Sequence, residues 1–313
     1  MKNYKIHFAG STTFSVKILE SLIESGEEVD LIISQPSKKS GRGLKLTPTP
    51  VSKLAMNRKI KLLTPTKLDK NLLENNSKKK NILVVAAYGQ IISEEILQHY
   101  NHLCINVHTS ILPRWRGAAP IQRAIMEGDL NTGISLMKIV KDLDKGPIFL
   151  SKEIPINLKN SSELFDELAI LGSNLLIDNL AEIYSGTLKP KEQNEKHVTY
   201  AHKLEKNEKM ISWNNPVFKI QRKIQGLNLN PGAWTFFNEK KLKIIDSEID
   251  KEKIHSKLEP GKIIKINKDG AYINCVDGNL LIKKLQNPSG KIVTAHEFFR
   301  STLKNKNVKQ FLE

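Results

Sequence analysis

The sequence is poor in cysteine and has no long apolar run. Its only two cysteines, Cys104 and Cys275, lie far apart and lack the paired spacing of a zinc or redox site. No segment approaches the ~18 apolar residues of a membrane-spanning helix, and the apolar run in MKNYKIHFAGS is shorter than a signal-peptide core. We therefore expect a soluble cytoplasmic protein with no bound metal and no membrane partner.

Acidic residues are scarce relative to basic ones. There are 33 Asp and Glu against 49 Lys and Arg, a formal net charge of +16. Residues 1–208 hold 29 basic and 23 acidic residues (+6), and residues 209–313 hold 20 and 10 (+10). Because the excess of positive charge is concentrated in the last third of the chain, a polyanionic partner such as nucleic acid is favoured. A high lysine content can also reflect genome composition or selection for solubility.

Several catalytic signatures are missing. The sequence has no serine nucleophile elbow, no P-loop and no zinc-binding histidine pair. The FAGS turn at 8–11 lacks the full glycine fingerprint of dinucleotide-binding turns. These absences argue against serine hydrolases, P-loop enzymes, zinc hydrolases and nicotinamide enzymes.

The first half of the chain alternates short β-branched runs with helical patterns. The runs lie at 4–9, 29–34, 82–87 and 103–107, which predicts a Rossmann-like α/β domain with a mostly parallel sheet. A helix is expected between the first two runs, with a stop at Gly26. A later helix, capped by Ser161 or Ser162, is expected to close this domain.

The pattern changes after a polar, highly charged stretch at 185–208. Short β-rich pieces follow, at 241–246, 261–267, 271–276 and 279–285. They predict a small antiparallel barrel, with an OB-like barrel as one candidate. With a length suited to two domains, we predict an N-terminal catalytic domain over 1–188, a linker over 189–208 and a basic C-terminal β-barrel domain over 209–313.

The stretch CINVHTSILPRWRGAAP (104–120) carries the most chemical information. Asn106 and His108 share one face at the carboxyl end of a predicted strand, where open α/β sheets bind ligands. A third polar group, Asp144, follows the apolar run 134–140. Each residue alone is more often structural than catalytic. If all three converge at strand ends, their amide, imidazole and carboxylate groups together suit acid–base chemistry.

Such a set suits acyl transfer to an amine. When an amine attacks a formyl carbon, negative charge develops on the carbonyl oxygen, and each prearranged hydrogen-bond donor is worth ~2.7 to 4 kcal/mol there. Asn106 and a protonated His108 are the candidate donors. Asp144 is the candidate group that orients His108 and receives the proton of the amine.

Long motifs resemble the methionyl-tRNA formyltransferase family, a branch of the 10-formyltetrahydrofolate-dependent formyltransferases. They are INVHTSILPRWRGAAPIQRAI (105–125), LDKG (143–146), AAYGQII (86–92), SQPSKKSGRGLKLTPTPV (34–51) and TYAHKLEKNEKMISWN (199–214). The resemblance implies formyl transfer from 10-formyltetrahydrofolate to the α-amino group of methionine on initiator methionyl-tRNA, for translation initiation. It places the catalytic trio at Asn106, His108 and Asp144.

The resemblance also implies ligand contacts. It maps folate binding onto Ser110, Ile111, Leu112 and Pro113, with Ala87, Tyr88 and Gly89 nearby. It implies that a glycine-containing and therefore mobile loop enters the acceptor end of the tRNA, with basic residues Lys38, Lys39, Arg42 and Lys45. From the charge pattern we add a basic face on the second domain, with Lys219, Arg222 and Lys223, and we expect a monomer.

The chain departs from the family at a few positions, and other functions stay open. Thr109 stands where glycine is common, and Asp142 and Lys145 add charges beside Asp144. One alternative is a relative that formylates a purine precursor or an amino sugar with the same trio, without need of the basic loop or barrel. A second is an RNA-binding protein without turnover, against which the intact trio argues.

Overall fold

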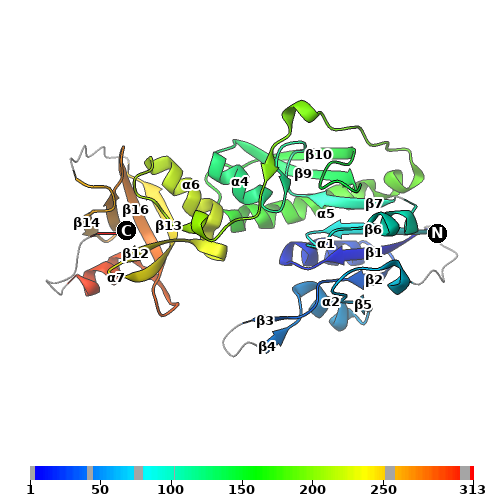
Figure 1. The fold of residues 1–313 in the computed structure, drawn as a ribbon, viewed down its shortest axis with the longest axis horizontal. Coiled ribbons are helices and arrows are strands. Elements are labelled where there is room, and N and C mark those ends of the chain that lie inside the picture. The colour runs from blue at the N-terminus through cyan, green and yellow to red at the C-terminus, as the bar shows by residue number, and fades with distance from the viewer. Residues whose placement is uncertain (1–3, 41–44, 74–79, 102, 251–257, 304–310) are drawn as a thin grey trace. The chain divides into compact units, whose positions relative to one another are not determined.

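The computed structural model describes residues 4–40, 45–73, 80–101, 103–250, 258–303 and 311–313 (Figure 1). The chain forms two compact units. The first unit comprises Met1–Pro120, Asn131–Pro155 and Phe165–Ala201, and the second comprises Ile121–Leu130, Ile156–Leu164 and His202–Glu313. Residues 189–201, which belong to the predicted linker, are thus part of the first unit. Two segments from the predicted catalytic domain, Ile121–Leu130 and Ile156–Leu164, are part of the second unit. The sequence boundaries at 188 and 209 stay predictions.

Seven strands form the sheet of the first unit, in the order β10-β9-β7-β6-β1-β2-β5. Neighbours from β7 to β5 pair in parallel, whereas β9 runs antiparallel to both β7 and β10. The predicted mostly parallel α/β sheet is confirmed. The strands are β1 (Tyr4–Gly10), β2 (Val29–Ile33), β5 (Lys61–Leu63), β6 (Lys80–Ala86), β7 (Cys104–His108), β9 (Asn131–Lys138) and β10 (Ile148–Pro155).

Helices cover both faces of this sheet, so its central strands are apolar on both sides. On one face, Gly172 of α5 (Ser161–Ser185) approaches so closely that a Cβ there would lie 3.0 Å from the Val107 side chain and 3.3 Å from that of Ile18 in α1 (Thr13–Glu24). The opposite face carries a buried cluster that includes Ala9, Leu83 and Ile96. That cluster lies under α3 (Glu94–His99) and the short helix η1 (Lys70–Leu72).

Local sequence explains where these helices begin and end. Thr12 and Ser15 form a reciprocal capping box at the start of α1, and Gly26, at φ +76°, follows its end as predicted. The predicted cap of α5, Ser161 or Ser162, was wrong, because the capping residue lies one or two positions earlier. The Asn160 side chain accepts the backbone N–H groups of Ser162 and Glu163 at 2.9 and 3.1 Å, because asparagine is among the strongest N-cap residues.

Two short strands lie in the segment after β2, and the predicted mobility of its glycine-containing loop stays a prediction. Strands β3 (Lys38–Ser40) and β4 (Lys45–Thr47) pair as an antiparallel hairpin, and α2 (Pro50–Arg58) follows directly with Thr49 as its cap. Arg42 lies outside the described residues.

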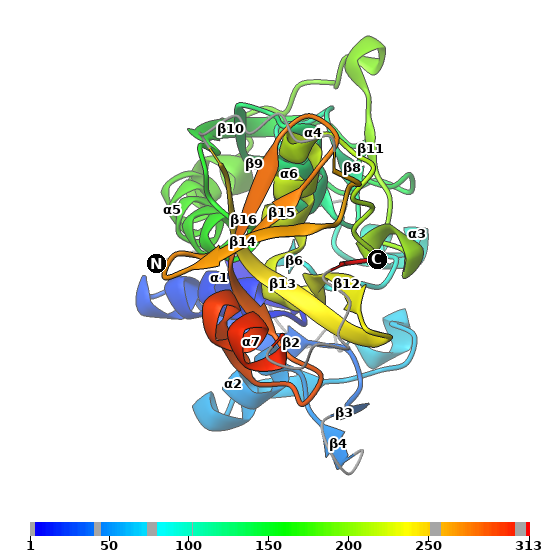
Figure 2. The same cartoon turned by 90° about the vertical axis from the view of Figure 1, so that its left-hand side faces the viewer.

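The second unit contains a six-stranded antiparallel sheet in the order β12-β13-β16-β15-β14, with β17 beside β16 (Figure 2). Its core includes Trp213, Ile224, Leu242 and Phe299. The elements are α6 (Val217–Leu227), η4 (Asn228–Gly232), β12 (Ala233–Phe237), β13 (Lys240–Ile249), β14 (Ile263–Asn267), β15 (Gly270–Asn274), β16 (Asn279–Gln286), β17 (Ile292–Thr294) and α7 (Ala295–Thr302). The antiparallel β-rich domain is confirmed, and in the order of its paired strands β12 and β14 are the two ends.

Shorter elements complete the chain. Strand β8 (Arg116–Gly117) pairs in parallel with β11 (Tyr200–Ala201) in the first unit. Helix α4 (Pro120–Glu127) leads from the first unit into the second, and η2 (Glu195–His197) and η3 (Asn207–Lys209) are single turns. Among the described residues, no helix combines the length and apolar character needed to cross a bilayer.

The buried His7 of β1 is expected to make stability depend on pH. Its ring lies 2.6 Å from the Tyr100 hydroxyl and 3.2 Å from the Asp30 carboxylate, and burial lowers its pKa to about 4, although Asp30 opposes the shift. The folded protein thus binds this proton more weakly than the unfolded chain, whose histidine has a pKa near 6.5, so the free energy of unfolding should fall as pH drops from about 6.5 to about 4.

A His7→Gln variant tests this expectation by urea denaturation across that pH range. The difference in unfolding free energy between wild type and variant should shrink by on the order of 2 kcal/mol toward acid pH. The variant also controls for carboxylates that titrate in both proteins. If the unfolding free energies of wild type and variant change in parallel with pH, the role assigned to His7 is contradicted.

Candidate active site

Strand β7 places two polar side chains at its carboxyl end. Asn106 and His108 are two residues apart and therefore lie on the same face of the strand. The strand pairs with β6 on one side, at Val85 opposite Asn106, and with β9 on the other, at Ser135 opposite His108. Because β7 is an inner strand of the sheet, both side chains stand on a rigid base.

Asp144 arrives by a route that the sequence did not predict. It was expected at the end of a strand alongside the other two, but β9 runs antiparallel to β7, and Lys138 at its end pairs with Ile105 near the start of β7. Residues 139–147 fold back over the sheet to bring Asp144 to the other end of β7. In this loop Asp144 adopts φ +50°, a left-handed backbone conformation uncommon for residues other than glycine.

The three side chains meet around the Asp144 carboxylate. Its Oδ1 accepts a hydrogen bond from Asn106 Nδ2 at 3.3 Å, and its Oδ2 lies 3.7 Å from His108 Nδ1. The backbone N–H of Gly117 donates to Oδ2 at 2.9 Å. The side chains of His108 and Asp144 are 6% and 10% exposed, so solvent screens their interaction little.

The second ring nitrogen of His108 fixes the position of one proton. Nε2 lies 3.0 Å from the carbonyl oxygen of Trp115, and a carbonyl oxygen only accepts, so Nε2 carries a proton. Nδ1 is then the nitrogen that faces Asp144. Donation from Nδ1 consequently requires the doubly protonated imidazolium form.

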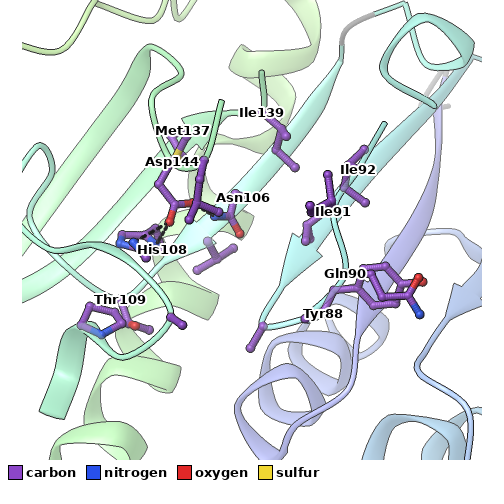
Figure 3. Close-up of a pocket in the computed structure, with 18 of the residues that line it drawn as sticks. Tyr88, Gln90, Ile91, Ile92, Asn106, His108, Thr109, Met137, Ile139 and Asp144 are labelled. Atoms are coloured by element: carbon purple, nitrogen blue, oxygen red, sulfur yellow. Dashed lines mark hydrogen bonds and ion pairs between the residues drawn. The ribbon is translucent and has the colours of Figure 1, made fainter. Parts of the chain in front are cut away.

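A cavity of about 480 Å³ opens beside the trio, within the range of small-molecule sites. Figure 3 shows Asn106, His108 and Asp144 on one side of it and Tyr88, Gln90, Ile91 and Ile92 on the other. The remaining wall is mostly apolar, with contributions from Phe14, Val85, Val107, Met137, Ile139, Val140 and Leu143. Ile91 and Leu143 are 84% and 68% exposed, unusual for apolar side chains beside a cavity.

The predicted folate contacts separate into two groups. Ala87, Tyr88 and Gly89 line the cavity, and burial raises the pKa of Tyr88 to about 12. Ser110, Ile111, Leu112 and Pro113 are not among its lining residues. Their turn is tied to β9, because Ser135 Oγ donates to the Ser110 carbonyl at 2.8 Å and accepts from the Leu112 N–H at 3.1 Å.

Sequence reasoning missed most of the apolar wall and one backbone donor. Ile139, Val140 and Leu143 come from the loop that carries Asp144. The apolar run at 134–140 could have indicated Ile139 and Val140 as part of this wall. The Gly117 N–H was also missed as a donor to Asp144. Its φ of +127°, and the 2.7 Å that would separate a Cβ from the Ala201 carbonyl oxygen, explain why glycine stands there.

The predicted tRNA contacts lie in both units. In the first, Lys38 donates to Gln35 Oε1 at 2.6 Å, and Lys39 and Lys45 are exposed on the β3–β4 hairpin. In the second, α6 carries Lys219, Arg222 and Lys223 beside a cavity of about 320 Å³.

These three cations of α6 differ in their surroundings. Lys219 is exposed, whereas the Arg222 guanidinium lies 5.2 Å from the Phe218 ring centre. Lys223 Nζ donates to the Met210 carbonyl at 2.9 Å, and burial lowers the pKa of this amine. Lys219 is therefore the most accessible of the three to a phosphate.

Comparison with known proteins defines the class. A sequence profile of the formyl transferase family matches residues 4–180, and a profile of the formyl transferase C-terminal domain matches residues 203–303. The chain therefore belongs to the formyl transferase family, as the sequence motifs indicated.

Its relatives narrow the class further. Methionyl-tRNA formyltransferase of Magnetococcus marinus is 36% identical over 303 residues, 96% of each chain. That of a Sulfurihydrogenibium species is 40% identical over 301 residues, 95% of this chain and 96% of the relative. HypX from Aquifex aeolicus, solved in complex with tetrahydrofolic acid, aligns with a TM-score of 0.67 at 17% identity, which shows the fold alone. The alignment covers 96% of this chain but 48% of HypX.

Proposed function

We propose that this protein transfers the formyl group of 10-formyltetrahydrofolate to the amino group of methionine on initiator methionyl-tRNA. The observation that carries the proposal is the Asn106, His108 and Asp144 cluster beside a mostly apolar cavity, in a chain whose full-length relatives are methionyl-tRNA formyltransferases. We also propose that the enzyme is a monomer and that it acts in the cytoplasm.

The geometry supports distinct roles for the three side chains. Asp144 receives the proton of the attacking amine, because with His108 protonated its carboxylate is the only basic group in the trio. As the amine nitrogen bonds to the formyl carbon, charge develops on the formyl oxygen. The N–H of Asn106 that does not bond Asp144 and the Nδ1–H of a protonated His108 then stabilise this oxygen. The carbonyl then re-forms as the bond from formyl carbon to folate nitrogen breaks, and the folate nitrogen takes the proton that Asp144 received from the amine.

The cavity suits a folate as the formyl donor. A pteridine ring has flat faces that pack well against apolar side chains and a polar edge that forms hydrogen bonds, and the wall between Tyr88 and Val140 is mostly apolar. Exposed Ile91 and Leu143 are available to cover such a ring once it binds, because exposed apolar side chains at a cavity often mark a ligand contact. Tetrahydrofolic acid is the ligand of the structurally similar HypX.

The second unit is proposed to bind the tRNA through its basic residues. Residues 209–313 carry a net charge of +10, and the exposed Lys219 supports contact with phosphate. We also propose that its sheet is an OB-like barrel, since Phe311 and Leu312 bridge to Lys262 before β14 and to Phe237 of β12, the two ends of the strand order. We propose that the basic residues Lys38, Lys39 and Lys45 of β3 and β4, together with Arg42, contact the acceptor end.

A substrate comparison tests the proposal. Purified enzyme with 10-formyltetrahydrofolate should formylate initiator methionyl-tRNA and leave an amino sugar or a small purine precursor amine unmodified. The incorporated formyl group is measured on each acceptor. Formylation of the small amines without formylation of the tRNA would show that the tRNA is not the substrate. The absence of transfer to any acceptor would contradict the proposal that the protein is a formyltransferase.

Binding of the tRNA is expected to weaken steeply with salt. The logarithm of affinity should fall with the logarithm of salt concentration, with a slope of about −0.7 to −0.9 for each phosphate neutralised. Lys219→Ala should make the slope shallower by about one such increment. Lys152→Ala, which removes an exposed lysine of β10 outside the predicted basic surfaces, serves as the control. An affinity independent of salt would refute the electrostatic basis.

A further inference from the structure

A buried arginine lies next to the candidate active site without touching the trio. Arg116 is 1% exposed. Its Nε and Nη2 donate to Gln193 Oε1 at 3.0 and 2.8 Å, and its two terminal nitrogens donate to the Glu195 carboxylate at 2.8 and 3.3 Å. A buried guanidinium needs acceptors for its donors. Gln193 and Glu195 supply them from a stretch predicted to be only a linker.

The amide nitrogen of Gln193 continues this network to the loop that carries Asp144. Its Nε2 donates to the carbonyl oxygens of Asp144 and Gly146, at 2.8 and 2.7 Å. The guanidinium can only donate and the two carbonyls can only accept, so the orientation of the amide is fixed by its partners. Every hydrogen of this amide is therefore used to hold the loop.

The loop has a physical need for such support. The φ of +50° at Asp144 is a left-handed backbone conformation that persists in a residue other than glycine only when the surroundings hold it. Gln193 holds the carbonyl of Asp144 while Gly117 and Asn106 hold its carboxylate. The residue is thus fixed from both its backbone and its side chain.

The same stretch of chain also positions the Gly117 donor. Strand β11 pairs with β8, so the Arg116 N–H donates to the Thr199 carbonyl at 3.0 Å and the Ala118 N–H to that of Ala201 at 2.8 Å. The Gly117 N–H between them points to Asp144 Oδ2. Gln193 therefore supports the backbone of Asp144, and Thr199 and Ala201 support a donor to its carboxylate.

We propose that Gln193 is a positioning residue for formyl transfer: it acts through Asp144, and Arg116 orients its amide. This inference rests on the proposed function. Gln193 holds the carboxylate where it contacts His108 and can receive the proton of the amine. Loss of its two donors should displace Asp144 and slow the chemical step without changing how either substrate binds.

Two substitutions test the donors. Gln193→Met keeps the length of the side chain and removes all of its hydrogen bonds. Gln193→Glu keeps an acceptor for Arg116 but places a carboxylate against two carbonyls. Each should lower kcat about tenfold and leave KM for methionyl-tRNA and for the folate within about twofold. Should the methionine variant fail to fold, the glutamate variant carries the test, because Arg116 keeps its partner.

The control is Glu195→Gln. It changes the other, more exposed partner of Arg116, which contacts neither carbonyl of the loop, and should leave kcat within about twofold of wild type. Wild-type kcat in both Gln193 variants would overturn the proposal. So would a loss confined to KM, since that is the result expected if the stretch only shapes a binding surface.

A double-substitution cycle separates positioning from general stability. In an Asp144→Asn background, Gln193→Met should lower the residual rate by less than about twofold, because there is no carboxylate left to position. An additional tenfold loss in that background would contradict action through Asp144. If Asp144→Asn lowers the rate and the Gln193 variants do not, this inference alone fails. If wild type transfers no formyl group, the proposed function fails.

Discussion

Replacing Asp144 with Asn is expected to lower kcat for formylation of methionyl-tRNA by about 10³- to 10⁴-fold. Asparagine keeps the size of the side chain but cannot receive the proton of the amine, and it removes the negative charge 3.7 Å from His108 Nδ1. Losses of this size are typical when a carboxylate that orients a catalytic histidine is neutralised. Initial rates measured with both substrates well above KM give kcat directly.

Asp142→Asn is the matched control for this prediction. Asp142 is an exposed carboxylate two residues earlier in the same loop and lies 3.9 Å from Lys145, so the substitution makes the same chemical change outside the trio. It should alter kcat by less than about threefold. Equal losses in the two variants would mean that general charge near the cavity matters, and wild-type activity of Asp144→Asn would contradict the proposed mechanism.

Gly146→Ala is expected to lower kcat by about 100-fold and to reduce stability. A Cβ at this position would lie 1.8 Å from the carbonyl oxygen of Lys138, so the backbone must move by an ångström or more. Asp144 lies two residues earlier and would move with it, and misplacement of a reacting group by ~1 Å can cost about 10² in rate. Thermal denaturation measured alongside kcat separates loss of rate from loss of folded enzyme.

Gly186→Ala provides the comparison for that substitution. Gly186 also belongs to the first unit, but nothing lies within 4 Å of a Cβ built there, although its φ is +76°. The variant should therefore lose about 1–2 kcal/mol of stability from backbone strain and keep kcat. If Gly146→Ala retains full activity in its folded fraction, the loop does not position Asp144 as described.

The sheet of the first unit was predictable because its central strands are apolar on both faces. The runs at 4–9, 29–34, 82–87 and 103–107 correspond to β1, β2, β6 and β7, and buried parallel strands leave such continuous runs in a sequence. Asn106 and His108 were also placed correctly near the end of one strand. The family was recognisable from motifs longer than 15 residues.

The parts that escaped prediction depend on contacts between distant residues. The antiparallel direction of β9 follows from pairing with β7, which composition does not encode, and it changes how Asp144 reaches the other two side chains. The role of residues 189–201 escaped for the same reason. Their polar composition is typical of a linker, yet Gln193 lies 49 positions from Asp144 in sequence and hydrogen bonds to its backbone. The tRNA contacts stay predictions.

The pairing of β8 with β11 has a consequence for synthesis of the protein. Asn106, His108 and Asp144 have all left the ribosome well before Tyr200 and Ala201, which pair with Arg116 and Gly117. A nascent chain that ends before residue 189 thus holds the three polar side chains but not the partners of Arg116, nor the amide that holds the Asp144 loop. The candidate active site is completed only when translation has passed the first unit's last strand.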